Sequence, residues 1–193
     1  MQHIEIEFKN LLTKEEYERL LAHFNIEPSQ IIPQANHYFE TPKGHLKQAM
    51  SGLRIRQIDD YFECTLKEKS SEHGHLETNV EITKQQAEEV LATGHFPFPE
   101  ITTRLEIIGV PVDELSLFGS LQTDRAEVPY EDGLLVLDRS NYLQRVDYEV
   151  EYEASNEQLG AVSFQKLLEA HNIPQRQTDK KIARFMNALN ESK

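Results

Sequence analysis

The sequence predicts an α+β fold: a closed eight-stranded antiparallel β-barrel with a charged lumen, covered outside by amphipathic helices. Two observations support this prediction. Several segments alternate between apolar and ionised residues, as a strand does when its two faces meet different surroundings. Other segments carry apolar residues at helical spacing and begin with capping sequences. Closing the strands into a barrel would gather the ionised faces around one lumen and leave the apolar faces for the helices to cover.

The first expected strand, His3–Lys9, shows the alternation most clearly. Three apolar residues share one of its faces, and three ionised residues share the other. The ionised residues are Glu5, Glu7 and Lys9. The same alternation returns in Gly52–Arg56, Glu63–Lys67, Glu77–Ile82 and Asp147–Glu153.

Capping sequences, residue alternation and turn residues predict the elements that follow the first strand. A capping box at Thr13–Glu16 predicts the start of a helix. The segment Ala35–Thr41 alternates as a strand does. Two further strands, Leu53–Ile58 and Tyr61–Lys67, are separated by Asp59-Asp60, which predicts a hairpin.

The middle of the chain continues with a strand at Leu76–Ile82 and a second capping box at Thr83–Gln86. The helix that this box starts should run to about Leu91. Apolar residues at helical spacing between Ile101 and Ile108 predict another helix. A long strand should then cover Leu117–Val128.

The last third of the chain should contain two strands and two helices. The turn Glu131-Asp132-Gly133 leads into a strand at Leu134–Asp138, and Arg145–Glu153 is the last strand. Ser155–Gln158 caps a helix. A final helix is expected at roughly Asp179–Leu189, with an apolar face.

Composition limits the class of protein. The chain has 193 residues and no linker rich in Gly, Ser or Pro, which favours a single domain over residues 1–193. Its 38% hydrophobic residues suffice for a core, and no run of them reaches transmembrane length. A net charge of -13 argues against nucleic acid and anionic membranes as partners. The N-terminus lacks the pattern of a signal peptide, and the single cysteine, Cys64, fits a reducing cytoplasm.

The ionised faces have the chemistry of a metal-bound polyphosphate site. Carboxylates at alternate strand positions lie roughly 7 Å apart, so Glu5 and Glu7 are placed to hold a hard cation, alone or with Glu149 and Glu151. The forked donors of arginines such as Arg54 match phosphate oxygens. The simpler alternative is a set of cross-strand salt bridges on a solvated sheet face. Repetition over five strands favours the ligand site, because an empty lumen of that charge is costly to desolvate.

The motifs also resemble a known family. Glu5-Ile6-Glu7-Phe8-Lys9 is similar to the Glu-x-Glu-x-Lys signature of the CYTH superfamily, the triphosphate tunnel metalloenzymes. Further segments resemble CYTH motifs in order: Asn36–Thr41, Leu53–Arg56, Thr65–Lys67, Thr123–Arg125, Leu137-Asp138, Glu149–Glu151 and Lys181–Arg184. Together they span nearly the whole chain, and the resemblance is strongest to the short stand-alone bacterial members.

This resemblance implies an eight-stranded tunnel that binds a small-molecule triphosphate with Mg²⁺ or Mn²⁺. By residue, it implies metal ligands at Glu5, Glu7, Glu149 and Glu151, with Asp138 and Glu153 as further candidates. It leaves open which acidic residues of Glu149–Glu153 form the binding pair. Phosphate contacts are implied for Lys9, Arg54, Arg56, Lys67, Arg125, Lys181 and Arg184. Tyr38 would orient a phosphate oxygen or the attacking water, and either a second metal ion or Lys9 would position that water.

Three functions remain open from the sequence. The first is metal-dependent hydrolysis of a triphosphate, with inorganic triphosphate favoured over nucleoside and thiamine triphosphates because no cluster suggests a base pocket. The second is an adenylyl cyclase of the class IV type, as some members of the resembled superfamily are. The third is a non-enzymatic binder of polyphosphate or nucleotide, which would not need the full acidic set.

Overall fold

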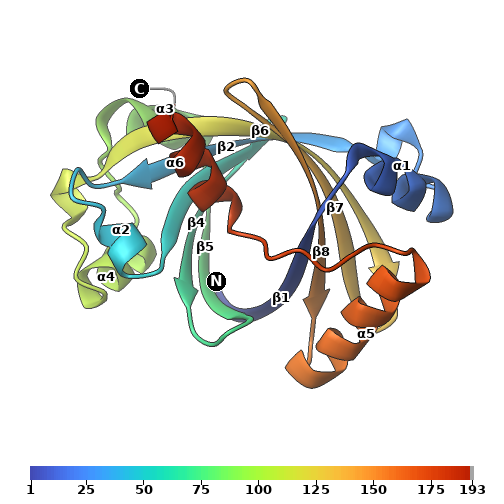
Figure 1. Cartoon of the computed structure of the whole chain (residues 1–193). Coiled ribbons are helices and arrows are strands. Elements are labelled where there is room, and N and C mark those ends of the chain that lie inside the picture. The colour runs from blue at the N-terminus through green and yellow to red at the C-terminus, as the bar shows by residue number, and fades with distance from the viewer. Residues whose placement is uncertain (192–193) are drawn as a thin grey trace. The chain divides into compact units, whose positions relative to one another are not determined.

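The computed structural model of the protein describes residues 1–191. Its strands form a closed barrel in the order β1-β5-β4-β3-β2-β6-β7-β8, which confirms the predicted fold class (Figure 1). The strands are β1 (Gln2–Leu12), β2 (Ile32–Glu40), β3 (Gly52–Ile58), β4 (Tyr61–Lys69), β5 (Gly74–Ile82), β6 (Ser116–Tyr130), β7 (Gly133–Tyr142) and β8 (Arg145–Ala154). The α-helices are α1 (Lys14–His23), α2 (His45–Gln48), α3 (Lys84–Thr93), α4 (Pro99–Ile107), α5 (Glu157–Ala170) and α6 (Lys181–Glu191).

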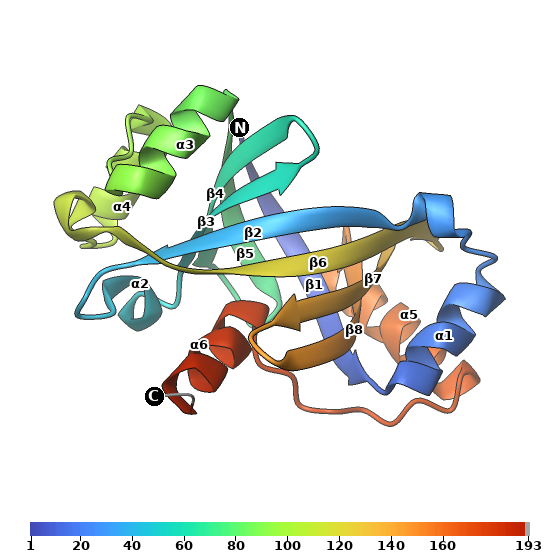
Figure 2. The same cartoon turned by 90° about the horizontal axis from the view of Figure 1, so that it is seen from above.

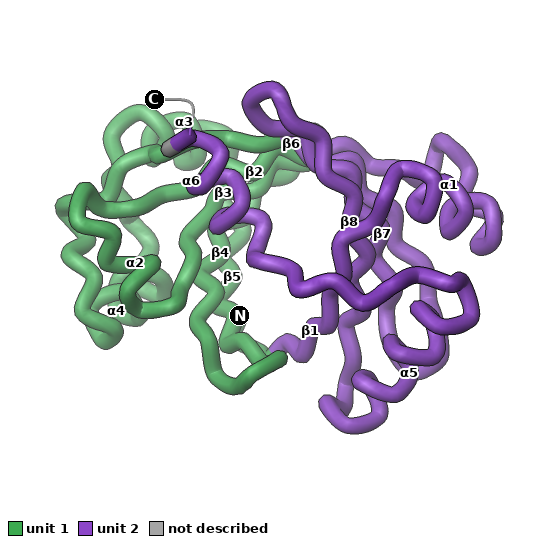
Figure 3. Tube along the Cα trace, viewed as in Figure 1, with its two compact units in different colours: residues 1–4, 34–121 green, residues 5–33, 122–193 purple. Residues whose placement is uncertain are grey.

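Two compact units make up the chain, and each is described by itself (Figure 3). Unit 1 consists of residues 1–4 and 34–121, and unit 2 of residues 5–33 and 122–193. That the whole chain is one CYTH-like domain stays a prediction. None of the helices in residues 1–191 is both long and apolar enough to cross a membrane.

Unit 1 has an antiparallel sheet in which alternate residues face a hydrophobic core. In the β3–β4 hairpin Leu53 pairs with Leu66 and Ile55 pairs with Cys64, and all four side chains are fully buried. Helices α3 and α4 complete this core with residues such as Val90 and Leu105. The alternation in the sequence therefore placed the apolar face correctly, and Cys64 belongs to the core.

The ends of the unit 1 helices follow the capping rules. The Thr83 side chain accepts a hydrogen bond from the backbone N–H of Gln86, which completes the predicted capping box of α3. Gly94 ends α3 in the left-handed region at a φ of 72°, where a Cβ atom would lie 2.1 Å from the carbonyl oxygen of Leu115. The short helix α2 was not predicted. The carboxylate of Glu40 holds it by accepting from the backbone N–H groups of Leu46 and Lys47.

Unit 2 packs α1 and α5 against the apolar face of its strands (Figure 2). Phe8 of β1, Leu137 of β7 and Phe164 of α5 belong to one buried cluster. Gly160 lets α5 approach closely, because a Cβ atom there would lie 2.5 Å from the Cβ of Ala154 and 2.7 Å from the Phe8 ring. Thr13 caps α1 as predicted, and Asn156, within the predicted capping segment Ser155–Gln158, caps α5.

An irregular segment joins α5 to α6 and runs beside β1 within unit 2 (Figure 1). We call residues 174–178 the strap. The Asn10 side chain donates to the carbonyl of Pro174 and accepts from the backbone N–H of Arg176. Arg176 also forms a forked ion pair with Glu16, at 2.8 and 2.9 Å. The strap therefore fixes the chain a few residues before α6 begins.

Most element boundaries agree with the expectations to within a few residues. The main difference is β7, which was expected to end at Asp138 and continues to Tyr142. The extra residues pair with the start of β8, because the turn between the strands lies at Leu143, beyond the expected strand end. Sequence alternation is weak there, since Ser140 and Asn141 are polar neighbours.

Candidate functional site

Three carboxylates from β7 and β8 lie together in unit 2. Asp138 pairs in register with Glu149, and Glu151 lies two residues further along β8 on the same face. Their side chains are almost completely buried, with exposed fractions of 0%, 1% and 7% respectively. We call these three residues the carboxylate cluster. A buried group of like charges requires cations beside it.

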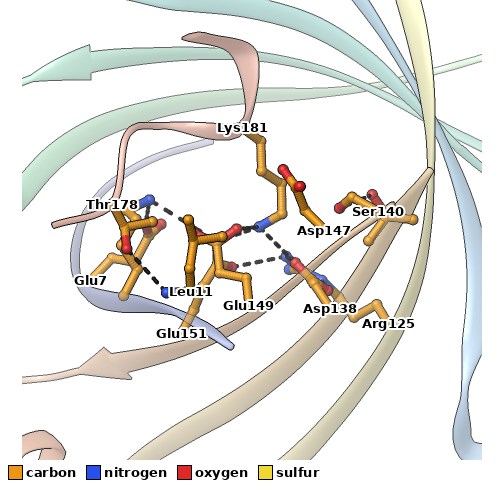
Figure 4. A network of polar contacts seen from close by, with 12 residues as sticks. Glu7, Leu11, Arg125, Asp138, Ser140, Asp147, Glu149, Glu151, Thr178 and Lys181 are labelled. Atoms are coloured by element: carbon orange, nitrogen blue, oxygen red, sulfur yellow. Dashed lines mark hydrogen bonds and ion pairs between the residues drawn. The ribbon is translucent and has the colours of Figure 1, made fainter. Parts of the chain in front are cut away.

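Lys181, the first residue of α6, supplies one of these cations (Figure 4). Its Nζ lies 2.8 Å from an oxygen of Asp138, 2.9 Å from one of Glu149 and 2.5 Å from one of Glu151. One ammonium group therefore contacts all three carboxylates at once, as a bound cation would.

Arg125 of β6 is the second cation. Its Nε and Nη2 atoms donate to the two oxygens of Asp138 at 2.8 and 2.6 Å, and Nη2 also donates to Glu151 at 3.0 Å. Arg125 and Asp138 are cross-strand partners in the β6–β7 register, so the forked pair is set by strand pairing. A bidentate pair of this kind orients both side chains strongly.

Arg184, one turn along α6, is the third cation. Its Nη2 donates to Glu149 at 2.8 Å and its Nε donates to Asp147 at 2.9 Å. Asp147 also accepts from the hydroxyl of Tyr142. Burial and the Asp147 carboxylate raise the pKa of Tyr142 to about 12, so this hydroxyl stays a donor.

The same cations set the ionisation of the carboxylate cluster. Burial alone would raise the pKa of Asp138, but Arg125 and Lys181 lower it well below its usual range. Burial also opposes the ionised form of Glu149, and Lys181 and Lys9 overcome that effect and lower its pKa. For Lys181 the balance is reversed: burial lowers the pKa, and the carboxylates raise it well above its ordinary value. All these groups are therefore charged at neutral pH.

The acidic residues of β1 lie beside this cluster. Glu7 forms an ion pair with Lys9, and the Lys9 ammonium lies 4.0 Å from Glu151, its register partner on β8. Glu153 differs from the other acids. Burial, followed by the charge of Glu5, raises the pKa of Glu153 to about 7. Glu153 pairs in register with Glu7 at this end of the β1–β8 ladder.

The predicted phosphate-binding residues of unit 1 share one face of its sheet. Arg54 and Arg56 of β3 alternate with core residues, and Lys67 of β4 lies on the same face by register. We call these three residues the basic cluster. Tyr38 is buried and is the register partner of Arg54, and the Nε of Arg56 donates to Asn36 at 3.2 Å.

Glu77 of β5 belongs to this face and was not predicted as a site residue. It is buried, pairs in register with Lys67, and lies 3.3 Å from the Lys67 ammonium. Burial opposes its ionisation, and the charges of Lys67 and Arg54 prevail and lower its pKa. The sequence shows the alternation of Glu77–Ile82. Because alternate residues of a strand share a face, Glu77 and Asn79 lie on its polar face, and this is the signal that could have identified Glu77 as a site residue.

The predicted site residues thus fall into the two units. Unit 2 brings together Lys9, Arg125, Asp138, Glu149, Glu151, Lys181 and Arg184, with Glu7 paired to Lys9. Unit 1 places Tyr38, Arg54, Arg56 and Lys67 on one face. The roles of these residues, and the convergence of all of them on one cavity, stay predictions.

The carboxylate cluster fits a hard divalent cation by its donor chemistry. Carboxylate oxygens are the ligands that Mg²⁺ and Mn²⁺ prefer, and the cluster already surrounds a cation, the Lys181 ammonium. Within residues 1–191, no group of three or more His, Cys, Asp or Glu side chains stands ready in metal-binding geometry.

Comparison with known proteins agrees with the geometry. The CYTH domain family matches residues 3–186. The Bacillus subtilis (strain 168) protein named "Putative triphosphatase YjbK" is 42% identical over 193 residues, covering 99% of this chain and 98% of that protein. The chain belongs to the CYTH domain family, as its motifs indicated.

Solved structures of similar proteins cover nearly the whole chain. The crystal structure of a "putative adenylate cyclase" from Bacillus halodurans has a TM-score of 0.92 and 42% identity, covering 95% of this chain and 98% of that one. The Hippeastrum protein HpAC1, described as an adenylyl cyclase candidate with a dominant triphosphatase activity, has a TM-score of 0.80 and 26% identity, covering 97% of this chain and 96% of that one.

Proposed function

We propose that this protein hydrolyses a small-molecule triphosphate with the help of a divalent metal ion. The observation that carries the proposal is the buried carboxylate cluster, which gathers three acids around one cation in a CYTH-domain chain. The 42% identity to a protein named as a triphosphatase over almost its full length supports the same reaction. A buried acidic cluster has no evident use in a protein that only binds anions.

The proposed metal ligands are the acids of β1, β7 and β8. They are Glu5, Glu7, Asp138, Glu149, Glu151 and Glu153. A Mg²⁺ or Mn²⁺ ion bound by some of these residues would neutralise phosphate charge and orient the triphosphate. The low pKa of Asp138 and Glu149 supports this role, because a hard cation binds the ionised form.

The proposed phosphate contacts come from arginines and lysines. They are Arg54, Arg56, Lys67, Arg125, Lys181 and Arg184. Their donors would bind non-bridging oxygens and stabilise the charge that these oxygens carry in the transition state. Lys9 would position a water molecule in line with the terminal phosphorus, and Tyr38 would orient the water or a phosphate oxygen. Attack of that water breaks the bridging P–O bond, so inorganic triphosphate yields orthophosphate and pyrophosphate.

Inorganic triphosphate is the proposed substrate, and the cytoplasm the proposed location. The motifs carry no aromatic or amide cluster that must serve as a base pocket. The proposal is tested by a turnover screen of inorganic, nucleoside and thiamine triphosphates with Mg²⁺ and with Mn²⁺, followed by product identification. Metal-dependent release of orthophosphate supports it. No turnover of any triphosphate with either metal contradicts it.

Adenylyl cyclase activity is the second candidate, favoured by the description of the Bacillus halodurans structure. A cyclase places the ribose 3′-hydroxyl at the α-phosphorus, whereas a hydrolase places water at the terminal phosphorus. ATP in the same screen separates them. Cyclic AMP with pyrophosphate indicates a cyclase, and ADP with orthophosphate indicates a hydrolase.

A further inference from the structure

We propose that Lys181 occupies the cation position of the carboxylate cluster and exchanges with the divalent metal ion. Metal binding would expel the Lys181 ammonium and free it to contact phosphate. This inference rests on the proposed use of a metal by this cluster. In this role Lys181 would lower the apparent affinity for the metal and would couple metal binding to the position of α6. A lysine that only contacts phosphate would have neither effect.

The first argument is the position of the ammonium. It contacts an oxygen of each of the three carboxylates within 2.9 Å, from two strands that are paired in register (Figure 4). The Lys181 side chain is only 13% exposed, so water does not replace these contacts. A metal bound by the same three oxygens would have to occupy the space that the ammonium fills.

The second argument is the balance of charge. The three carboxylates contact three cations, Lys181, Arg125 and Arg184. A fourth, the Lys9 ammonium, lies 4.0 Å from Glu151. Adding a divalent ion beside these largely buried cations without removing one would bring further positive charge close to them out of water, which is strongly unfavourable. Repulsion between like charges therefore favours the departure of one cation when the metal binds.

The third argument is that Lys181 is the cation best able to leave. Arg125 lies within β6 and is held by two hydrogen bonds to its cross-strand partner Asp138. Lys181 is the first residue of α6 and follows an irregular segment. Its charge is at the end of a flexible four-carbon side chain, so its ammonium can move without displacing a strand. Arg184 donates to Asp147 as well as to Glu149, so a second carboxylate, outside the cluster, also holds it in place.

The fourth argument is that the strap keeps Lys181 close by. The Thr178 hydroxyl oxygen accepts from the backbone N–H of Leu11 at 3.0 Å, three residues before Lys181. On the other side, the Phe185 ring packs edge-on against Tyr142 at 5.7 Å between centroids. Because Lys181 is tethered close to the carboxylate cluster, its ammonium competes with the metal at a high effective concentration. The apparent affinity for the metal is then the intrinsic affinity multiplied by the fraction of molecules in which Lys181 has left the cluster.

The test measures binding of Mn²⁺ alone to the full chain, by calorimetry or by the electron paramagnetic resonance signal of free Mn²⁺. Lys181→Met should bind Mn²⁺ roughly tenfold more tightly than the wild type, because the competitor is gone. The matched control is Lys166→Met, which removes the same charge from an exposed position on α5 and should stay within about twofold of the wild type. Equal or weaker Mn²⁺ binding by Lys181→Met overturns the inference.

A second measurement needs no variant, in case Lys181→Met does not fold. Acetylation of the wild-type lysines by a small reagent is followed by mass spectrometry with Mn²⁺ and with a chelator. We expect labelling of Lys181 to rise severalfold with Mn²⁺ and labelling of Lys166 to stay constant. Unchanged labelling of Lys181 at saturating Mn²⁺ overturns the exchange.

The outcomes also separate this inference from the proposed function. Metal-dependent triphosphate turnover with unchanged Lys181 labelling contradicts the exchange alone. Mn²⁺-dependent labelling of Lys181 without turnover of any triphosphate supports the exchange and contradicts the proposed hydrolysis.

Discussion

The guanidinium of Arg125 donates to both oxygens of Asp138, at 2.8 Å from Nε and 2.6 Å from Nη2. Asp138 has no exposed surface, and Arg125 is buried with it. The pair joins β6 to β7 and presents Asp138 to Lys181 at the same time. It is therefore both a structural link and part of the candidate site.

Asp138→Asn should destabilise unit 2 strongly, because it removes the buried charge that Arg125 and Lys181 both contact. The expected loss in the free energy of unfolding is about 3–5 kcal/mol, measured by urea denaturation without metal. The adjacent pair Asp124–Arg139 on the same two strands is the control, since it is 3.7 Å apart and substantially exposed. Asp124→Asn should cost less than about 1 kcal/mol. Similar small losses for both variants would contradict the structural role of Asp138.

Glu153→Gln should stabilise the metal-free protein at high pH. The pKa of Glu153 is about 7 in the folded chain and near 4.5 when unperturbed, so the folded state holds a proton that the unfolded state has lost. The stability that this group contributes is complete below pH 4.5 and is lost as the pH rises through 7. At pH 8 the variant should be more stable than the wild type by about 1–3 kcal/mol.

Denaturation curves between pH 4.5 and 8 check the Glu153 prediction, and the difference should shrink as the pH falls. Asp132→Asn, at the exposed turn between β6 and β7, serves as the control and should follow the wild-type pH profile. A stability difference that does not change with pH would mean that Glu153 titrates normally.

Glu7→Gln should abolish metal-dependent turnover and leave the fold intact. The amide is nearly isosteric, but it removes one of the charges that would hold the metal. At limiting Mg²⁺ we expect a loss of activity at least as large as the roughly 10–100-fold that follows removal of a group supporting a metal ligand. Activity is measured over a Mg²⁺ titration, with the melting temperature as the check on folding. Full activity at limiting Mg²⁺ would remove Glu7 from the metal site.

Metal and triphosphate together should raise the melting temperature more than either alone. A ligand that binds only the folded state at a hundredfold excess over Kd adds about 2.7 kcal/mol, which is roughly 5–10 °C for a chain of this length. Melts with Mn²⁺, with triphosphate and with both test this, and Arg56→Ala should reduce the joint shift. Equal shifts from sulfate and triphosphate would show that the site is not specific for both ligands together.

Gly160→Ala should destabilise unit 2 by about 1–3 kcal/mol, because the added methyl group overlaps Ala154 and the Phe8 ring. An exposed helical glycine would instead gain stability from the same change. The measurement is the midpoint of chemical denaturation. Leu159→Ala, at a 64% exposed neighbouring position, should change stability by less than about 0.5 kcal/mol. A more stable Gly160→Ala would show that α5 can move away from β8.

Strand faces and helix starts were determined by the sequence alone. The odd-numbered residues Glu5, Glu7 and Lys9 share a face because successive side chains of a strand point to opposite sides. The capping boxes at Thr13 and Thr83 form because a side-chain oxygen and a backbone N–H three residues later are close in any helix. Such features depend only on neighbours in the chain, so local patterns suffice to predict them.

The partners of each charge were decided by the tertiary structure. Alternation places Asp138 and Arg125 on ionised faces, but the β6–β7 register decides that they pair, and register depends on contacts between distant residues. The sequence placed Lys181 on a helix and implied a phosphate contact. Its position among Asp138, Glu149 and Glu151 depends on how the strap is held by Asn10 and Glu16. The contacts of the strap with Asn10 and Glu16 join segments far apart in the chain, so no local sequence pattern predicts them.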